Sequence, residues 1–471
     1  MKTSLLFVVV LLNFLCGAQV NYPKQNIELL SLSTPNFGVG GIDNRLYSGC
    51  WGWYQQSKNK EYAICGASNG TYFMDITNPA TPTVCAYVLG KLGSTYREMK
   101  TYQNYCYIVS DDAPPNKFQI VDMQYLPDSV HIVHEGTTYF ERAHTIWIDQ
   151  DKMYLGSVQY TAGFSSMNVY SLATPTAPLL LRELDDDVPP PLINLVHDMY
   201  VRNDTVYASC GYEGLHFLKY NSVTNKFAQL GSYTGYGTVG SFNHSSTLSQ
   251  NGKYLLFCDE VPGTLPMRFV NVENFGNVQP IQAFKPSPLT TPHNPYMIGN
   301  DFAVVACYQD GINIYDLSIP GSASISGFFD THPQGGANVN NYFGADYRGT
   351  WGAYPWLPSK IIIAQDMQNG VFLLDATAAY SNRAGISNSS LLTGEVLIYP
   401  NPASENISVK FESAEPFVIQ IENVLGKVVY QKNYPATINE TINVTDLAGG
   451  TYVITIKNSR QLINKKIVIY K

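Results

Sequence analysis

The segment Pro292–Ser318 reads PHNPYMIGNDFAVVACYQDGINIYDLS. It contains three short apolar runs. The second is Phe302–Cys307, and the third follows the turn Gln309–Gly311 and ends at Asp316. Short runs of this kind between Gly, Asn and Asp residues are typical of β-strands joined by tight turns. One such unit cannot bury both of its faces, so it predicts a fold in which similar units stack side by side.

Similar segments recur along the chain, and each begins at a marked residue. The marked residues are Trp51, Arg97, His144, His197, His244, His293 and Trp351. Their spacing of roughly 50 residues is typical of β-propeller blades of about four short strands. We therefore predict an all-β chain with a seven-bladed β-propeller over residues 26–375. The alternatives are six blades, if the region 338–347 distorts the count, and an array of β-sandwiches.

The two ends of the propeller are predicted to meet in one blade. The seventh repeat supplies only three strands before Ala376, whereas Asn26–Ser33 is a strand with no neighbour in sequence. If this strand completes the last blade, the ring closes and an exposed sheet edge disappears.

Composition and the N-terminus point to export. Residues 1–18 have the pattern of a signal peptide, with Lys2, the apolar run Leu5–Leu15 and the small residues Gly17 and Ala18. No later stretch is long and apolar enough to be predicted as a membrane span. The net charge of -8 argues against nucleic acid as a partner.

The cysteines also bear on the compartment. Seven remain after the predicted signal peptide, and five of them fall in the second strand of a repeat: Cys65, Cys106, Cys210, Cys258 and Cys307. An odd count leaves at least one thiol unpaired, and the repeated position favours buried packing over disulfide bonds.

A second domain follows the propeller. Residues 376–392 are rich in Ser and Asn, which is typical of a linker. Residues 393–471 contain seven short runs that alternate between apolar and polar residues. This pattern predicts a small immunoglobulin-like β-sandwich.

The repeats resemble a known propeller family. The pieces DITNPATPTV, FQIVDMQ, INIYDLS and VFLLDAT are similar to LVIVD repeats. The ordered set WGW, YREMKTY, AHTIWI, VHDMYV, NHSSTL, PHNPYMI and TWGAYPW, over about Tyr47–Asp375, resembles the choice-of-anchor B family. Two repeats depart from the pattern, because MNVYSLATP and MRFVNVEN lack the usual Asp. The resemblance implies an exported bacterial propeller and no particular reaction.

The C-terminal residues resemble the type IX secretion C-terminal sorting domain, type A. The matching residues are Tyr399–Pro402, Leu425–Gly426, Gly450–Tyr452 and the basic end Lys465–Lys471. The resemblance implies a Bacteroidota-type source and passage through the periplasm. It also implies recognition by the type IX secretion machinery, followed by release or attachment at the cell surface.

The histidines are the candidates for chemistry. His144, His197, His244 and His293 occupy one register in consecutive repeats, and the first strands of propeller blades line a central channel. Imidazoles in such a place suit a transition metal such as Cu, Zn, Fe or Ni. Two alternatives stay open, namely a structural role for each histidine and a site for a polar ligand. The further channel-lining candidates are Trp51, Arg97, Asp198, Asn294 and Trp351.

No hydrolase motif supports a catalytic reading. The sequence has neither GxSxG nor HExxH. The acids Asp111–Asp112 are interpreted as solvated loop residues, with calcium binding as the alternative. We therefore expect a binding or interaction module at the cell surface or secreted, with a protein, glycan or small molecule as its ligand. The alternative is a metal-binding protein or metal-dependent oxidoreductase that uses the histidine-lined channel, and a transition metal is the only cofactor suggested.

Overall fold

The structure is a computed structural model. It describes residues 20–36, 40, 44–94, 96–112, 116–190, 192–237, 239–343, 347–383, 386–387, 397–423, 427–457 and 462–471. The predicted signal peptide 1–18 lies outside these residues, as do residues 384–385 and 388–392 of the predicted linker 376–392. The described part is almost entirely β-structure. Its helical segments are α1 (Thr377–Ser381) and two 3-10 turns, Leu184–Asp186 and Ala337–Val339.

Consecutive antiparallel sheets make up the first part of the chain. Sheet 1 contains β3 (Tyr47–Gln55), β4 (Lys60–Ala67), β5 (Gly70–Asp75) and β6 (Thr83–Leu89). Sheet 2 contains β7 (Arg97–Tyr102), β8 (Tyr105–Ser110), β9 (Phe118–Asp122) and β10 (His131–Gly136). Sheet 3 contains β11 (Thr145–Asp149), β12 (Lys152–Tyr160), β13 (Gly163–Ser171) and β14 (Leu179–Glu183).

The later sheets follow the same plan. Sheet 4 contains β15 (Asp198–Arg202), β16 (Thr205–Ser209), β17 (Leu215–Asn221) and β18 (Lys226–Tyr233). Sheet 5 contains β19 (Phe242–Leu248), β20 (Tyr254–Val261), β21 (Met267–Asn271) and β22 (Gln279–Phe284). Sheet 6 contains β23 (Asn294–Ile298), β24 (Phe302–Ala306), β25 (Ile312–Asp316) and β26 (Ser324–Phe329). Sheet 7 contains β27 (Thr350–Tyr354), β28 (Ile362–Asp366) and β29 (Gly370–Asp375).

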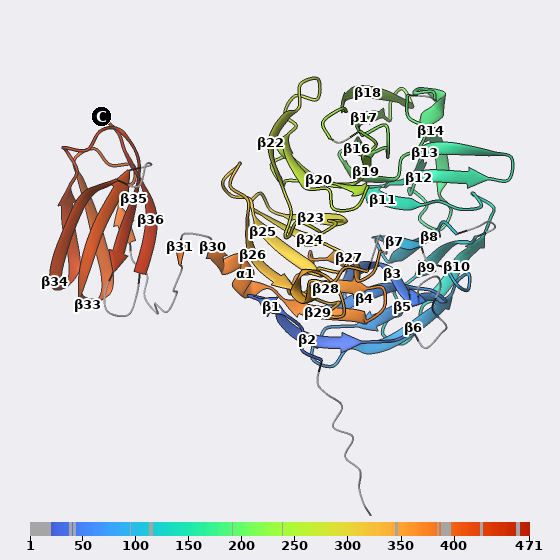
Figure 1. The fold of residues 1–471 in the computed structure, drawn as a ribbon, viewed down its shortest axis with the longest axis horizontal. Coiled ribbons are helices and arrows are strands. Elements are labelled where there is room, and N and C mark those ends of the chain that lie inside the picture. Colours follow the sequence, from blue (N-terminus) through green and yellow to red (C-terminus); the bar gives the residue numbers. More distant parts are fainter. Residues whose placement is uncertain are drawn as a thin grey trace, which may run out of the picture.

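The first strands of these sheets form a closed ring. Each of β3, β7, β11, β15, β19 and β23 contacts the first strand of the next sheet, and β27 of sheet 7 contacts β3 of sheet 1. The sheets are arranged around this ring as the blades of a β-propeller (Figure 1). Each predicted repeat corresponds to one sheet. The sheets follow one another around the ring in the same order as the repeats in the sequence.

The N-terminal strand closes the ring as predicted. Strand β2 (Glu28–Ser33) pairs antiparallel with β29 and becomes the fourth strand of sheet 7. The sequence did not predict the two-residue strand β1 (Lys24–Gln25), which adds a fifth strand to sheet 6 beside β26. Between β1 and β2 lies Ile27, which is fully buried in the core shared by sheets 6 and 7.

Apolar side chains fill the spaces between neighbouring sheets. The core between sheets 6 and 7, for example, joins Ala306 and Ile314 to Ala364 and Phe372. All seven cysteines in the described residues are free thiols, and six of them are buried. Cys65, Cys106 and Cys258 lie in second strands, whereas Cys210 and Cys307 directly follow them. The prediction of buried packing rather than a disulfide framework is confirmed.

The C-terminal domain has fewer and longer strands than the sequence predicted. They are β32 (Leu397–Tyr399), β33 (Asn406–Asn423), β34 (Val428–Asn443), β35 (Gly450–Lys457) and β36 (Leu462–Ile469). Four predicted short strands are joined in pairs within β33 and β34, and the pairing of these two shifts register near Glu415. Such irregularities let a strand bend without ending. The bent halves enclose one core that includes Ile407, Ile421 and Ile454.

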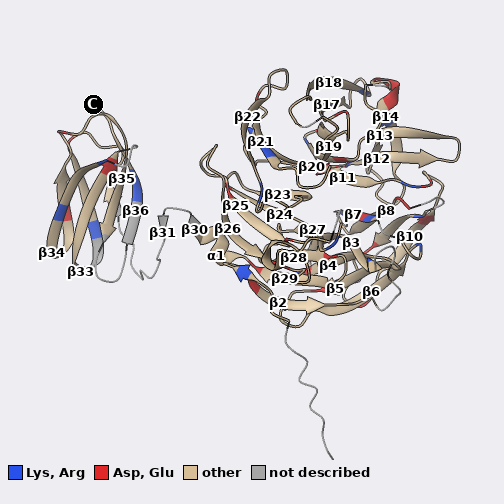
Figure 2. Ribbon diagram, in the orientation of Figure 1, with Lys and Arg blue, Asp and Glu red and all other residues tan. Residues whose placement is uncertain are grey.

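Charged residues are sparse and dispersed. Figure 2 shows Lys and Arg as short, separate segments across the described part of the chain. Within those residues, no helix is long and apolar enough to cross a membrane.

We predict that Ile27→Ala lowers the free energy of unfolding by about 2–5 kcal/mol, because it leaves a cavity in the core that ties the N-terminus to the ring. Leu32→Ala, on the exposed face of β2, is the matched control and should cost less than about 1 kcal/mol. Urea titration followed by tryptophan fluorescence measures both, since all five tryptophans lie in the propeller. Equal losses in the two variants would contradict this account of ring closure.

Candidate functional site

Six aromatic rings form a closed circle at the channel, and we call this set the aromatic circle. The ring centroids of His144 and His197 are 4.2 Å apart, those of His197 and His244 4.4 Å, and those of His244 and His293 4.3 Å. Trp351 lies 5.0 Å from His293 and 5.6 Å from Tyr96, and Tyr96 lies 6.0 Å from His144. Sheets 2 to 7 each contribute one ring.

The backbone explains why these residues share one level. The amide of His144 donates to the carbonyl of Gly156 at 3.0 Å, that of His197 to Ser209 at 2.8 Å, and that of His293 to Ala306 at 2.9 Å. The bonds of His197 and His293 join the start of a first strand to the end of the second strand in the same sheet, and that of His144 reaches Gly156 within the longer strand β12. The repeated register predicted for the histidines is therefore a repeated backbone geometry.

Two marked residues do not occupy this level. In sheet 2 the place belongs to Tyr96, one residue before Arg97. Arg97 is among the residues that line the inner channel, as predicted, but its guanidinium donates to the carbonyls of Ala67 and Lys91, both at 3.1 Å, and the residue is 1% exposed. It therefore supports the packing of sheet 2 against sheet 1. Aligning the second repeat with the others one residue earlier would have placed Tyr96, rather than Arg97, at the position of the histidines.

Sheet 1 contributes no side chain to the circle. A Cβ placed on Gly49 would lie 2.6 Å from the Arg97 carbonyl oxygen and from Glu98 Oε1. Only glycine fits in this space, so Tyr96 and Trp351 meet across sheet 1. Trp51, the other tryptophan among the marked residues, lies elsewhere in the channel. Its ring centroid is 6.2 Å from that of Trp147.

The remaining lining candidates are engaged in contacts within the channel. The Asn294 amide donates to the Trp351 carbonyl at 3.0 Å, and Asp198 accepts from the Thr145 hydroxyl at 2.9 Å. The sequence analysis did not single out Lys100, whose Nζ lies 4.2 Å from the Trp51 ring centroid and 3.5 Å from Glu98 Oε2. These contacts hold the inner strands together and fill the inner channel.

Hydrogen bonds fix the tautomers of two histidines. His197 Nδ1 donates to the His244 carbonyl at 3.2 Å, and His293 Nδ1 donates to the Trp351 carbonyl at 2.6 Å. Because a carbonyl oxygen only accepts, the proton lies on Nδ1 and the Nε2 atoms keep their lone pairs. Burial, reinforced by the neighbouring imidazoles, lowers the pKa of His197 and of His293 well below the usual range. Both rings are therefore neutral.

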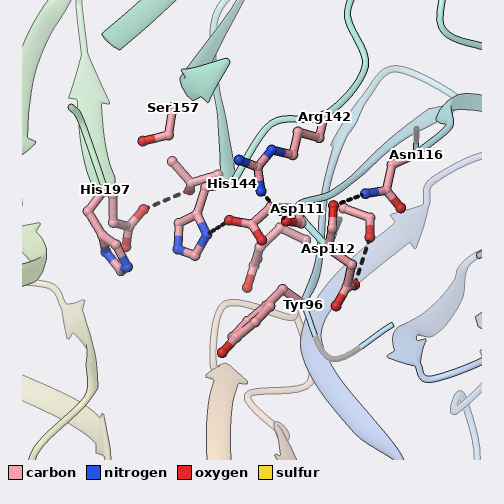
Figure 3. A network of polar contacts seen from close by, with 12 residues as sticks. Tyr96, Asp111, Asp112, Asn116, Arg142, His144, Ser157 and His197 are labelled. Atoms are coloured by element: carbon pink, nitrogen blue, oxygen red, sulfur yellow. Dashed lines mark hydrogen bonds and ion pairs between the residues drawn. The ribbon is translucent and has the colours of Figure 1, made fainter. Parts of the chain in front are cut away.

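His144 has a different environment. Its Nδ1 is paired with the Asp111 carboxylate, and Figure 3 shows this pair between Tyr96 and Arg142. Burial opposes protonation of the His144 ring, but the Asp111 carboxylate outweighs it and raises the pKa. Arg142 donates to the Asp111 carbonyl at 2.9 Å, and the Asp112 carboxylate accepts hydrogen bonds from the Ser94 and Ser110 hydroxyls. The interpretation of Asp111–Asp112 as solvated loop acids is therefore wrong.

His244 and His293 converge with a carboxylate. The ligand atoms of His244, Glu260 and His293 lie within 4.8 Å of one another, and His244 Nε2 is 3.7 Å from Glu260 Oε2. Glu260 also accepts a hydrogen bond from the Tyr308 hydroxyl, and the Tyr308 ring lies 4.3 Å from the His293 ring. Sequence reasoning missed Glu260 and Tyr308. Their position at the ends of second strands, like that of Asp111, is the signal that could have found them.

Two hollows share the rings of the aromatic circle. The inner channel, which is lined by Trp51, Lys100 and Trp147, has a volume of only about 70 Å³. The hollow on the other side, which we call the outer cavity, has a volume of about 370 Å³. Its wall contains five of the six rings, without His293, together with Arg45, Asp111, Ser157, Leu195, Glu260, Tyr308 and Tyr347. The outer cavity is therefore the side with room for a ligand.

The C-terminal domain decides how the chain is handled by the cell. Residues 397–470 match the family described as the secretion system C-terminal sorting domain. This domain is a type IX sorting domain. It marks the chain for secretion by the type IX system to the cell surface or the extracellular space, as the sequence predicted. Its Leu425–Gly426 motif lies outside the described residues.

Several solved structures are similar to the chain as a whole. PorZ of Porphyromonas gingivalis, described as an essential bacterial surface component of the type IX secretion system, is 10% identical with a TM-score of 0.45. The match covers 93% of this chain and 61% of PorZ. A putative 6-phosphogluconolactonase from Bacteroides uniformis is 11% identical with a TM-score of 0.45, and 84% of this chain and 99% of that one are covered. Similarity at this level carries no argument about the site, and no curated protein matches the sequence.

We predict that Asp111→Asn lowers the pKa of His144, because burial then acts on that ring without a neighbouring carboxylate. In the parent chain the pair stabilises the fold below the unfolded histidine pKa of about 6.5, and this contribution is lost as pH rises through the raised folded pKa. The stability difference between parent and variant should therefore be largest in acid and shrink with rising pH, by up to about 1.4 kcal/mol per unit.

Urea titrations of the metal-free chains between pH 5 and 8 measure this difference. Asp151→Asn, at an exposed carboxylate beside Lys152, is the control and should run parallel to the parent chain. A gap for Asp111→Asn that is independent of pH would show that the Asp111–His144 pair does not titrate.

Proposed function

We propose that the exported propeller is a binding module, and that the ligand it binds at its channel is a divalent transition metal. The proposed protein ligands are His244, Glu260 and His293. The observation that carries the proposal is the convergence of two buried imidazoles and one carboxylate, with their ligand atoms within 4.8 Å of one another. The sorting domain supports a place of action at the cell surface or in the medium.

The donor set suits such an ion. Two imidazoles and a carboxylate are a common ligand set for Zn²⁺ and for non-haem Fe²⁺. Metal–ligand bonds of about 2.0–2.2 Å would place tetrahedral ligand atoms roughly 3.3 Å apart. The three side chains therefore need to move inward by about 1 Å or slightly more, which rotations about their side-chain bonds can supply.

The surroundings also fit a metal site. The Trp351 carbonyl holds His293 Nδ1 and so directs Nε2 away from it, which is the support usually found behind a metal-bound histidine. The Tyr308 hydroxyl performs the same task for Glu260. Burial raises the pKa of Tyr308 well above its usual value, so this group remains an O–H donor.

A purely structural role explains the histidines less well. His293 Nε2 and His244 Nδ1 are buried and have no hydrogen-bond partner. A buried polar atom without a partner costs about 1–3 kcal/mol. An ion bound by His293 Nε2 would remove one of these deficits, and a ring flip of His244 would let either of its nitrogens serve.

The proposed site is narrower than the four-histidine site suggested by the sequence. His144 is paired with Asp111, and His197 is held by the backbone of the next sheet. We place these two rings beside the ion rather than among its three ligands. No reaction is assigned to the site.

We predict that the untagged mature chain binds one equivalent of Co²⁺ or Zn²⁺. His293→Gln and Glu260→Gln should weaken binding by more than about 100-fold, because loss of a supporting partner alone costs about 10–100-fold. Tyr308→Phe, which removes such a partner, should fall within that smaller range. Isothermal titration and the visible spectrum of the Co²⁺ protein provide the affinities and the coordination.

His131→Gln, at an exposed histidine of β10, is the matched control and should bind as the parent does. Absence of stoichiometric metal in the parent chain after reconstitution would contradict the proposal. If both Glu260→Gln and His293→Gln bind the metal with unchanged affinity, the metal site lies at other residues.

We also predict that removal of residues 397–471 abolishes delivery to the surface or medium. The shortened chain should accumulate in the periplasm, because the signal for type IX secretion has been removed. Cell fractionation with an antibody against the propeller measures this. Tryptophan fluorescence checks that the retained propeller is folded, and secretion of the shortened chain at the parent level would refute the prediction.

A further inference from the structure

We propose that the outer cavity binds an oxyanion, a carboxylate or phosphate group of a small ligand, between the bound metal and Arg45. The inference rests on the proposed metal site and assigns to that site the chemical class of its exogenous ligand. It follows from the position of Arg45, from the donors around it and from the balance of charge in the cavity.

Arg45 is the fixed cation of the outer cavity. It is 8% exposed and belongs to the cavity wall together with Glu260 and His244. Its side chain hydrogen-bonds Tyr96 and acts electrostatically on the hydroxyl of Tyr308. A guanidinium group held in a wall by aromatic neighbours is the usual protein partner of carboxylate and phosphate groups, because its planar N–H groups match two oxygens at once.

Hydroxyl groups supplement this cation. Tyr96 and Tyr347 belong to the same wall, whereas the Ser157 hydroxyl in it already donates to the Val196 carbonyl at 3.0 Å. Burial raises the pKa of Tyr96, and burial together with Glu260 raises the pKa of Tyr347 to about 12. Both phenols are therefore neutral near pH 7 and can donate hydrogen bonds to an anion.

The metal itself should have a free position. Two histidines and a glutamate supply three ligands, and catalytic or exchangeable sites of this kind complete their coordination with water or an exogenous oxygen. His244 and Glu260 belong to the wall of the outer cavity, so that position is accessible from the side with room for a ligand. An oxyanion there would replace a water molecule.

Charge makes this binding depend on the metal. Without an ion, the cationic groups of the wall, Arg45 and the Asp111-paired His144, at most balance the two carboxylates Asp111 and Glu260, so the wall has no net attraction for an anion. A divalent ion makes the total charge positive. Arg45 and His244 in this wall are only 8% and 5% exposed, so the change acts at short range and with little screening. Metal and anion should therefore bind with positive coupling.

The test uses the full mature chain, metal-free or loaded with one equivalent of Zn²⁺ and freed of excess ion. Sodium acetate and inorganic phosphate are titrated separately by calorimetry. We expect binding of one anion per loaded chain and none to the metal-free chain. Binding of acetate alone identifies a carboxylate site and binding of phosphate alone a phosphate site, and either result supports the inference.

Arg45→Gln should weaken anion binding by about tenfold or more while zinc stoichiometry is retained. Arg202→Gln is the matched control, because Arg202 lines a pocket with Trp356 outside the outer cavity and contacts the carbonyls of Ser249 and Gln250. Tyr347→Phe provides a second variant if Arg45→Gln does not fold, with an expected loss of about two- to fivefold. A saturating concentration of the anion should raise the affinity for Zn²⁺ by the same factor by which bound Zn²⁺ raises the affinity for the anion.

Three results would overturn the inference. They are a zinc-loaded chain that binds neither anion, equal anion binding with and without zinc, and unchanged binding in Arg45→Gln and Tyr347→Phe. In each of these cases the zinc titration itself still succeeds, so the metal proposal stands. A chain that binds no zinc overturns the proposed function as well, and the direct metal titration distinguishes that result from the others.

Discussion

The hydrogen bonds between β2 and β29 are the constraint on which the rest of the structure depends. They join a strand near the N-terminus to the last strand of the propeller and so turn a row of sheets into a ring. Only in a ring do sheet 7 and sheet 2 approach each other across sheet 1, where Trp351 meets Tyr96 over Gly49. The aromatic circle is therefore a product of long-range closure, although each of its members is placed by local backbone hydrogen bonds.

The structural and the functional interpretations of the histidines turn out to be compatible. His197 and His293 each donate from Nδ1 to a backbone carbonyl in the following sheet, so each ring ties one sheet to the next. The same bond fixes the tautomer and leaves Nε2 as a lone-pair donor in a region of low polarity. One hydrogen bond thus contributes to the packing of the propeller and prepares a ligand atom. Histidine is the side chain that can do both, because its two nitrogens point in different directions.

Much of the architecture could be predicted from the sequence, and the reasons are local. Strand patterns, turn residues and the roughly 50-residue period are encoded within each repeat. The marked histidines could be predicted as channel residues because they occur at the same position in consecutive repeats. Glu260, Tyr308 and Arg45 are not among the marked residues. Glu260 and Tyr308 share only a position near the ends of second strands, and all three come near the site only when separate sheets close into a ring. Arg97 illustrates the opposite error, because a repeated position does not determine where a long side chain points. In β33 and β34 the polar residues that suggested strand ends mark bends instead.

The unpaired thiols of the propeller have a consequence for its life outside the cell. Six of the seven described cysteines are buried, and none forms a disulfide. Folding therefore needs no oxidising partner in the periplasm, and the finished domain has no cross-link that a reductant could break. Burial also raises the pKa of thiols such as Cys210 and Cys307 well above the usual range, which keeps them from exchanging with other disulfides. The described fold of the propeller therefore depends on no disulfide bond.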